Sequence, residues 1–329
     1  MGEKFLKIGT FNLYNLVLPG KLYYEDRCYT QADYERKIDW VAGQLRCLDA
    51  DVVGFQELFH TEALRAALDR SGIYENARLI ATPTDGEKPA VALVSRLPVL
   101  EYRIYKEFPL ALDIEGTAIP LNRFSRPVLS LRLQIDEQHE CSVYVVHLKS
   151  KRAVIPEDAD PEDPIEQVKG EARSLMRRAA EAAALRAILL KELQGRKYPV
   201  IVVGDVNDSG AAVTTSMISG SPPLKKLPFL QKRKVWDVLL YRVQDIQGRR
   251  SQRDVYYTHI HKGHFTSLDQ IMVSEEFVAQ NPKRIGRVQY VRVFNDHLID
   301  ETLSSEELPI WQSDHGQVMV SIELESSDR

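Results

Sequence analysis

The stretch PVIVVGDVND, residues 199–208, contains both a strand signal and a polar site signal. Residues 200–203 are consecutive apolar positions, which predicts a strand buried on both faces, because a half-exposed strand would alternate apolar and polar residues. Asp205 and Asn207 follow at once and are two positions apart, so on an extended strand end their side chains point to the same side. The stretch therefore predicts a buried strand whose carboxyl end carries polar chemistry.

Similar short apolar runs recur along the chain and predict further strands, at residues 5–11, 51–55, 90–94, 128–133, 141–146, 268–273 and 317–324. Three segments are predicted to be helices. Residues 34–48 and about 171–193 have apolar residues at helical spacing, and Thr61 could cap a third helix that stops near Gly72. Residues 155–166 and 209–234 are expected to be loops. Many strands with few long helices predict an α/β fold built from two packed sheets.

Composition excludes several classes of protein. The chain has 329 residues, of which 44% are hydrophobic and 27% charged, as in a globular protein. Its formal charge of −4 provides no general attraction for a polyanion, so any contact with nucleic acid must be local.

The segment MGEKFLKIGTFN lacks a secretory apolar region, and no run is long enough to span a membrane, so we expect a cytoplasmic protein without a membrane partner. No protein partner is indicated. The three cysteines, Cys28, Cys47 and Cys141, are expected in the core.

Six of the apolar runs have a carboxylate, an amide or a histidine at one end. These residues are Asn12, Glu57, His147, Asp205 with Asn207, Asp269, and Asp314 with His315. If the strands bring these ends to one rim, their oxygens form the environment that Mg²⁺ or Mn²⁺ prefers, and two imidazoles are available for proton transfer. This combination is suited to the hydrolysis of phosphate esters.

The motifs also resemble those of a known family. In order, they are FNLYN at 11–15, GFQEL at 54–58, HLKS at 147–150, GDVND at 204–208, SLDQIMVS at 267–274 and SDHG at 313–316. They are similar to the motifs of the endonuclease/exonuclease/phosphatase superfamily, the deoxyribonuclease I-like group, and most resemble bacterial nuclease-like members. The resemblance implies one domain over residues 1–329, a four-layered sandwich of two packed mixed β-sheets flanked by helices, and a phosphoesterase site that uses Mg²⁺ or Mn²⁺.

By the same resemblance, Glu57, Asn12 and Asp314 are the metal ligands. His315 is the general base, and Asp269 is the carboxylate that fixes its tautomer. Asp205 and Asn207 orient the nucleophile and stabilise charge on the phosphoryl oxygens. Strand-end solvation or turn formation is the plain alternative for each of these residues.

Two further residues are less securely assigned by the resemblance. His147 would contact a phosphate oxygen or protonate the leaving oxygen, and Glu87 is the nearest candidate for its carboxylate partner. Arg126 would contact phosphate, and a surface arginine is nearly as good an interpretation. Asn15 is expected to shape its loop and to lie outside the site.

Basic and histidine-rich stretches remain open to two interpretations. The basic runs are Lys149, Lys151 and Arg152; Lys232, Arg233 and Lys234; and Arg249, Arg250 and Arg253. Each is either a solvated face or part of a phosphate track at the rim. In YTHIHKGHFT the histidines, His259, His261 and His264, favour substrate contacts over a metal site.

The leading prediction is a metal-dependent phosphodiesterase, a nuclease with nucleic acid as its substrate. The first alternative is a phosphatase or phosphodiesterase that acts on a lipid headgroup, an inositol phosphate or a small nucleotide, because the same catalytic set serves those reactions. The second is a binding protein on the same fold. Such a protein would normally lack Glu57, Asp205 or His315, all of which are present.

Overall fold

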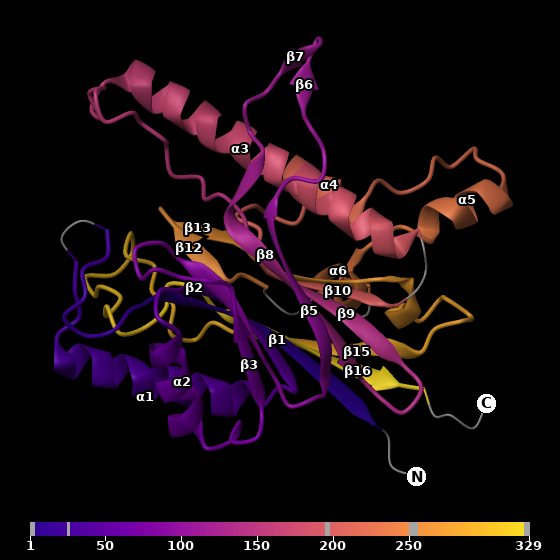
Figure 1. The fold of residues 1–329 in the computed structure, drawn as a ribbon, viewed down its shortest axis with the longest axis horizontal. Coiled ribbons are helices and arrows are strands. Elements are labelled where there is room, and N and C mark those ends of the chain that lie inside the picture. Colours follow the sequence, from indigo (N-terminus) through magenta and orange to yellow (C-terminus); the bar gives the residue numbers. More distant parts are fainter. Residues whose placement is uncertain (1–3, 25–26, 195–197, 250–255, 326–329) are drawn as a thin grey trace.

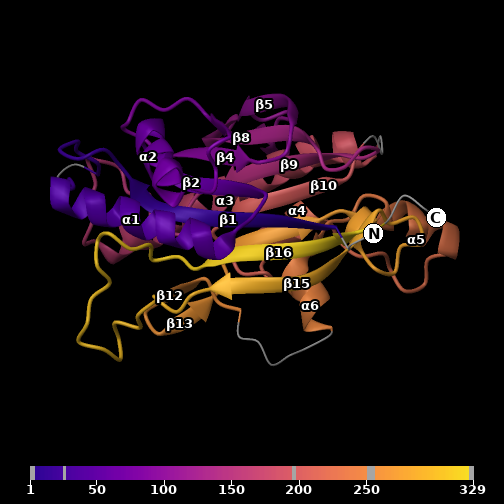
Figure 2. The same ribbon diagram turned by 90° about the horizontal axis from the view of Figure 1, so that it is seen from below.

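The computed structural model describes residues 4–24, 27–194, 198–249 and 256–325. Two six-stranded mixed sheets pack against each other, and helices cover their outer faces (Figures 1 and 2). This arrangement confirms the predicted α/β sandwich. No helix within the described ranges is long and apolar enough to cross a membrane.

The first sheet is centred on β1 and β2, which run parallel, while its other neighbouring strands are antiparallel. Its order is β15 (Gly286–Phe294), β16 (Gln317–Leu324), β1 (Phe5–Leu16), β2 (Val52–Leu58), β4 (Ala90–Ser95) and β3 (Arg78–Ala81).

The second sheet is centred on the parallel pair β9 and β10. Its order is β11 (Tyr241–Arg242), β14 (Asp269–Val273), β10 (Val200–Asp205), β9 (Glu140–His147), β8 (Arg123–Gln134) and β5 (Val99–Glu107). Two small hairpins stand apart from the sheets, namely β12 (His259–His261) with β13 (His264–Thr266), and β6 (Asp113–Ile114) with β7 (Thr117–Ala118).

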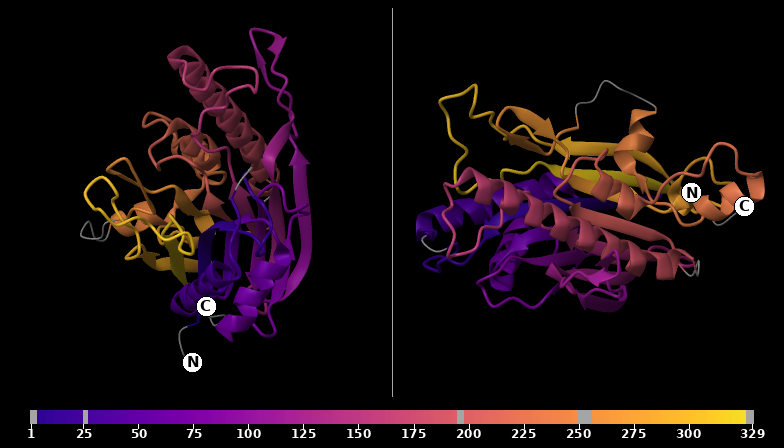
Figure 3. Two further views of the ribbon diagram at one scale, coloured as in Figure 1. Left: turned by 90° about the vertical axis from the view of Figure 1, so that its left-hand side faces the viewer. Right: turned by 90° about the horizontal axis from the view of Figure 1, so that it is seen from above.

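In the described part of the chain, the four helices that cover the sheets lie on their outer faces (Figure 3). Helices α1 (Gln31–Leu48) and α2 (Thr61–Ser71) pack on the first sheet, and α3 (Pro164–Leu193) and α4 (Val213–Ser219) pack on the second. The remaining helices are α5 (Phe229–Trp236), α6 (Val243–Gly248) and the 3₁₀ turn η1 (Glu275–Phe277). Figures 1 and 2 place α5 at the end of the molecule opposite hairpin β12–β13.

Strand β10 shows why the apolar runs are continuous. Ile201 and Val203 face the first sheet, whereas Val200 and Val202 pack beneath α3. Successive side chains of a strand point to opposite faces, so a strand in the middle of four layers must be apolar at every position.

Two motif glycines are required by close approach. A Cβ atom on Gly54 would lie 2.6 Å from Cγ2 of Val203, where the two sheets meet. Gly204 has a φ of +140°, and a Cβ atom there would lie 2.0 Å from the carbonyl oxygen of Val146. Glycine at both positions lets the strands that carry Glu57 and Asp205 pack closely.

Several local predictions were wrong. Helix α3 begins at Pro164 rather than near 171, because Asp163 caps it by accepting a hydrogen bond from the Ile165 backbone N–H, and proline suits the first helical position. The segment 209–234 contains α4 and most of α5. Thr61 is the first residue of α2 rather than its cap; His60 holds the N-cap position, and its side chain makes no capping hydrogen bond. Of the cysteines only Cys141 is buried; the other two, Cys28 and Cys47, are exposed.

Candidate active site

The predicted polar residues meet at one end of the two sheets. Strands β1, β2, β9 and β10 end there, and the antiparallel strands β14 and β16 begin there. In the second sheet, Asp205 is paired in register with His147 on one side and Asp269 on the other. Because β14 runs antiparallel to β10, Asp269 at the start of β14 lies beside Asp205 at the end of β10.

Asn12 connects the two sheets at this rim. Its Nδ2 donates to Oδ2 of Asp205 at 3.2 Å and lies 3.4 Å from Oε1 of Glu57, while its Oδ1 accepts from the backbone N–H of Tyr14. As oriented here, the amide presents its donor side to both carboxylates. Metal ligation through Oδ1 would require that oxygen to be shared with Tyr14.

The backbone around these residues is strained. Glu57 and Asn207 have φ values of 60° and 54°, and Tyr14 and Asn15 have values of 47° and 58°. Positive φ is uncommon for residues other than glycine and costs on the order of 1 kcal/mol each, so its clustering at one rim marks the rim as a functional candidate. The Asn15 backbone N–H donates to Oε2 of Glu57 at 3.1 Å, which uses the strained turn to fix that carboxylate.

His315 and Asp269 form a buried pair. Nδ1 of His315 lies 2.8 Å from Oδ2 of Asp269, and both side chains are less than a tenth exposed. Burial by itself lowers the pKa of His315, but the charge and hydrogen bond of Asp269, with Asp314 and Asp205 nearby, raise that pKa well above its ordinary value. The hydrogen bond to Nδ1 leaves Nε2 as the atom that faces the site.

Asp205 and Asn207 lie side by side as the sequence predicts. The Asn207 backbone N–H donates to Oδ1 of Asp205 at 2.7 Å, and Nδ2 of Asn207 donates to Oδ2 at 3.1 Å and to the Leu148 carbonyl at 2.9 Å. Burial raises the pKa of Asp205 to about 7, Asp269 and Glu57 add to this rise, and His315 opposes it. The proton affinity of Asp205 is therefore set by the whole cluster.

His147 is buried, and its Nε2 lies 3.6 Å from Oδ2 of Asp205 and 4.0 Å from Oε1 of Glu57. Burial, followed by the positive charge of Arg126, lowers the pKa of His147 well below its ordinary value, so the ring is neutral and neither contact is an ion pair. Glu87, the nearest candidate that the sequence offered, is exposed between β3 and β4. The carboxylates that face His147 are instead those of Asp205 and Glu57.

Glu57 and Asp314 lie together. Both line a pocket of about 590 Å³, in which Tyr14, Asn15, Tyr24, Arg27 and Arg152 are the other lining residues. Burial raises the pKa of Glu57, and the charge of Asp314 raises it further. Oδ1 of Asp314 is buried without a hydrogen-bond partner. The same oxygen lies 4.0 Å from Nε2 of His315. Two carboxylates with an amide nearby, and a carboxylate oxygen without a hydrogen bond, fit a divalent cation such as Mg²⁺.

Arg126 lies beside the same pocket. Its Nη1 donates to the Leu148 carbonyl at 3.3 Å. Its charge adds to the lowering of the His147 pKa by burial, and it opposes the rise that burial causes in the pKa values of Tyr24 and Glu57. The guanidinium is thus placed near the candidate metal ligands, where an anionic substrate would gain from it.

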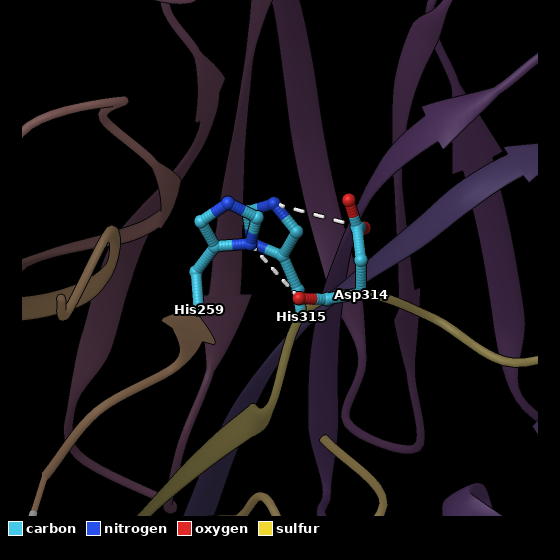
Figure 4. A group of neighbouring side chains, drawn as sticks. All are labelled: His259, Asp314 and His315. Atoms are coloured by element: carbon cyan, nitrogen blue, oxygen red, sulfur yellow. Dashed lines mark hydrogen bonds and ion pairs between the residues drawn. The ribbon is translucent and has the colours of Figure 1, made fainter. Parts of the chain in front are cut away.

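His259 was not singled out for this cluster. Its ring lies 4.8 Å from that of His315, and its Nδ1 lies 2.9 Å from the backbone carbonyl of Asp314. Figure 4 shows His259 beside His315, with Asp314 on the other side of His315. Among the described residues, His259, Asp314 and His315 could hold a metal ion, as could Asp205, Asp269 and His315. The sequence feature that could have identified His259 is its place in the histidine-rich stretch YTHIHKGHFT.

Lys37 is a second residue that the sequence reasoning missed. It is fully buried on α1, and its Nζ donates to the Tyr14 carbonyl at 2.8 Å and lies 5.4 and 5.3 Å from the rings of Tyr14 and Tyr29. Burial lowers its pKa to about 7, against the opposing effect of Asp314 and Glu57. Its position on the apolar stripe of residues 34–48 was the signal. Lys37 supports the strained turn at the rim.

We expect Lys37→Met to change how stability depends on pH. Between pH 7 and the ordinary lysine pKa of 10.5, the unfolded chain binds a proton that the folded protein does not, so Lys37 costs stability in full below pH 7 and less as the pH rises. The stability of the wild type relative to the variant should therefore increase by roughly 3 kcal/mol between pH 7 and 9.5. Denaturant unfolding in chelator measures this difference, and parallel pH curves would refute it.

Comparisons with known proteins agree with this architecture. The family model described as "Endonuclease/Exonuclease/phosphatase family" matches residues 9–315. No curated protein matches the sequence closely enough to be counted as a relative.

Solved structures match over nearly the whole chain. A humanized D. rerio TDP2 with 14 mutations has a TM-score of 0.59 at 15% identity, with 97% of this chain and 99% of that chain covered. The human Nocturnin catalytic domain with bound sulfate has a TM-score of 0.58 at 14% identity, with 98% of each chain covered. An endonuclease/exonuclease/phosphatase family protein from Bacteroides thetaiotaomicron has a TM-score of 0.58 at 13% identity, covering 99% of this chain and 100% of that one.

At these identities the structural likeness shows a shared fold, while the family model rests on the sequence of residues 9–315. Residues 9–315 contain every motif from FNLYN up to His315 in SDHG. The chain belongs to the endonuclease/exonuclease/phosphatase family, whose members hydrolyse phosphoester bonds.

Proposed function

We propose that this protein is a Mg²⁺- or Mn²⁺-dependent phosphodiesterase that hydrolyses nucleic acid. The observation that carries the proposal is the buried Asp269–His315 pair, 2.8 Å apart, at the rim where Asn12, Glu57 and Asp205 also meet. A tautomer-fixed imidazole beside a group of carboxylates is the arrangement needed to activate water near a bound phosphate.

In this proposal, Nε2 of His315 accepts a proton from the attacking water. Asp269 holds the ring through Nδ1 and stabilises the imidazolium that forms, because a carboxylate at 2.8 Å favours the charged ring. Asp205 and Asn207 orient the water from the neighbouring strand end. Their mutual hydrogen bonds keep them in place before substrate arrives.

Glu57 and Asp314, with Asn12 beside them, would hold the divalent cation. When bound, the cation polarises the phosphate and offsets part of the carboxylate charge that raises the pKa of His315. His147 is neutral, so it serves as an N–H donor to a phosphate oxygen rather than as a charged acid. Arg126 provides a cation on the same side.

Local charge supports nucleic acid as the substrate. Lys149 and Arg152 follow directly after His147, and Arg152 lines the pocket that contains Glu57 and Asp314. The basic run on α5 lies at the opposite end of the molecule, and Arg250 and Arg253 of the third run lie outside the described residues (Figures 1 and 2). Of the two runs that lie wholly within the described residues, the one after His147 is beside the candidate site, which supports a phosphate contact there.

A substrate panel tests the proposal. With Mg²⁺, the protein should hydrolyse bis(4-nitrophenyl) phosphate and DNA, and kcat/KM should be at least about tenfold higher for the diester than for 4-nitrophenyl phosphate, because no second negative charge then opposes the water. A chelator should stop hydrolysis, and added Mg²⁺ should restore it. Activity on inositol phosphates or lipid headgroups without activity on DNA would contradict the nucleic-acid assignment.

A further inference from the structure

A groove of about 1050 Å³ opens directly from the catalytic rim. Asn207 and His259 form its inner end, and Arg152 lies both in this groove and in the pocket of Glu57 and Asp314. A substrate held at the rim therefore has a continuous surface along which its remaining part can extend.

One wall of the groove is an apolar stripe on α3. Val168, Ala172 and Leu175 are spaced by four and three residues, so they share one helix face, and all three line the groove. Val168 is 64% exposed and Leu175 is 52% exposed. Large apolar side chains left open to water beside a catalytic centre indicate a ligand with an apolar surface.

The opposite wall is the hairpin β12–β13. His259, His261 and His264 line the groove from this side, and the rings of His259 and His261 are stacked 6.2 Å apart. Figure 1 shows α3 above this hairpin. The groove thus has aliphatic side chains on one wall and flat, polar rings on the other.

The segment that follows His147 forms the floor of the groove and is held against α3 by hydrogen bonds. The Val154 backbone N–H donates to the Gly170 carbonyl at 3.1 Å, and Nη1 of Arg178 donates to the Lys149 carbonyl at 3.2 Å. A Cβ atom on Gly170 would lie 2.9 Å from Cβ of Ala153, so the segment and the helix are in close contact. The groove is a built feature that does not depend on a ligand to form.

Charge and ring chemistry together select the occupant. Three cationic residues line the groove, Lys151, Arg152 and Arg178, against one carboxylate, Glu171. Asp208 pairs with Lys151 at 3.4 Å and with Arg178 at 3.3 Å, which leaves Arg152 as the cation outside these pairs. A lipid chain would gain from the apolar wall but not from imidazoles and cations. Duplex DNA would present phosphates and keep its base faces stacked inside. Unpaired nucleosides combine ring faces, which pack on aliphatic and imidazole groups, with phosphates for the cations.

We propose that this groove binds unpaired nucleosides, so that the substrate is single-stranded nucleic acid. This inference rests on the proposed phosphodiesterase function and specifies its substrate class. The scissile phosphate lies at the rim, and the nucleosides on one side of it lie between α3 and the hairpin.

A matched pair of variants tests the groove. Leu175 lines it, whereas the adjacent Met176, 54% exposed on the same helix, does not. Leu175→Glu should lower kcat/KM on a short single-stranded oligonucleotide about tenfold more than on bis(4-nitrophenyl) phosphate, because it replaces an apolar contact for a base with a negative charge that repels phosphate. Met176→Glu should match the wild type within about twofold on both substrates. Both positions are exposed, and thermal unfolding checks that both variants fold.

Binding provides a second readout that is independent of turnover. In chelator, fluorescence anisotropy should show that the wild type binds the labelled single strand about tenfold more tightly than the same strand in a duplex, and that Leu175→Glu removes this preference. Equal effects of the two glutamate variants, or equal affinity for duplex and single strand, would overturn the inference. So would Leu175-dependent binding to phosphatidylserine vesicles without binding to oligonucleotide. Absence of any diester hydrolysis would instead count against the proposed function and leave the binding result to decide the groove.

Discussion

Replacing His315 with alanine is expected to lower kcat on bis(4-nitrophenyl) phosphate by roughly 10²- to 10⁴-fold, the range that a general base typically supplies. The reason is geometric: the ring is buried, its Nδ1 is occupied by Asp269 at 2.8 Å, and only Nε2 is left to accept a proton from water. KM should change little, because the imidazole acts on water rather than on the substrate. Steady-state kinetics with saturating Mg²⁺ measures both constants.

The chain contains a matched control for this variant. His139 also has a carboxylate partner, Asp136, at 2.8 Å, but this pair lies just before β9, at the end of the strand away from the rim. His139→Ala should leave kcat within about twofold of the wild type. If the two alanine variants were equally active, His315 would not be the base.

Replacing Glu57 with glutamine is expected to lower kcat by roughly 10²- to 10³-fold, because a divalent cation contributes several kcal/mol to the stabilisation of charge in the transition state. Glutamine keeps the shape of the side chain and an oxygen for the Asn15 backbone N–H, which now donates to Oε2 at 3.1 Å. The substitution removes the negative charge of Glu57 beside Asp314. The Mg²⁺ concentration needed for half-maximal activity should rise, which a metal titration of the reaction rate measures.

Stability separates this loss from misfolding. Burial and the charge of Asp314 raise the pKa of Glu57, so its ionised form is disfavoured in the metal-free protein. Glu57→Gln should therefore unfold at the same or a higher temperature than the wild type in chelator. Glu140→Gln, at the opposite end of β9 beside Arg132, serves as the control and should keep both activity and metal dependence. A Glu57→Gln enzyme with normal Mg²⁺ dependence would remove Glu57 from the metal site.

The strand pattern made much of the fold predictable. Residues 200–203 are apolar at every position because β10 packs between the first sheet and α3, and a strand in that place has no face for a polar side chain. The start of α3 was missed because its first turn, PIEQ, is largely exposed, Ile165 included, so it contributes nothing to the buried apolar stripe of the helix. Apolar periodicity records burial, and it says nothing of a helix that extends into solvent.

The candidate site was predictable in membership more than in contacts. Asn12, Glu57, Asp205, Asp269 and His315 could be named because each stands at the end of an apolar run. Which oxygen faces which nitrogen depends on pairs far apart in the chain, such as Nδ2 of Asn12 and Oδ2 of Asp205, which are 193 positions apart. The residues next to a side chain in the sequence do not indicate which distant side chain it contacts.

The apolar runs of the sequence by themselves determined two packed sheets, and its motifs determined membership of a family that hydrolyses phosphoester bonds. Tertiary structure alone decided that Lys37 is buried beneath the strained turn, that His147 faces Asp205 and Glu57 rather than Glu87, and that Leu175 lies across a groove from three histidines. The physical reason is the same in each case. Burial and pKa depend on every group that packs around a side chain, and those groups come from distant parts of the chain.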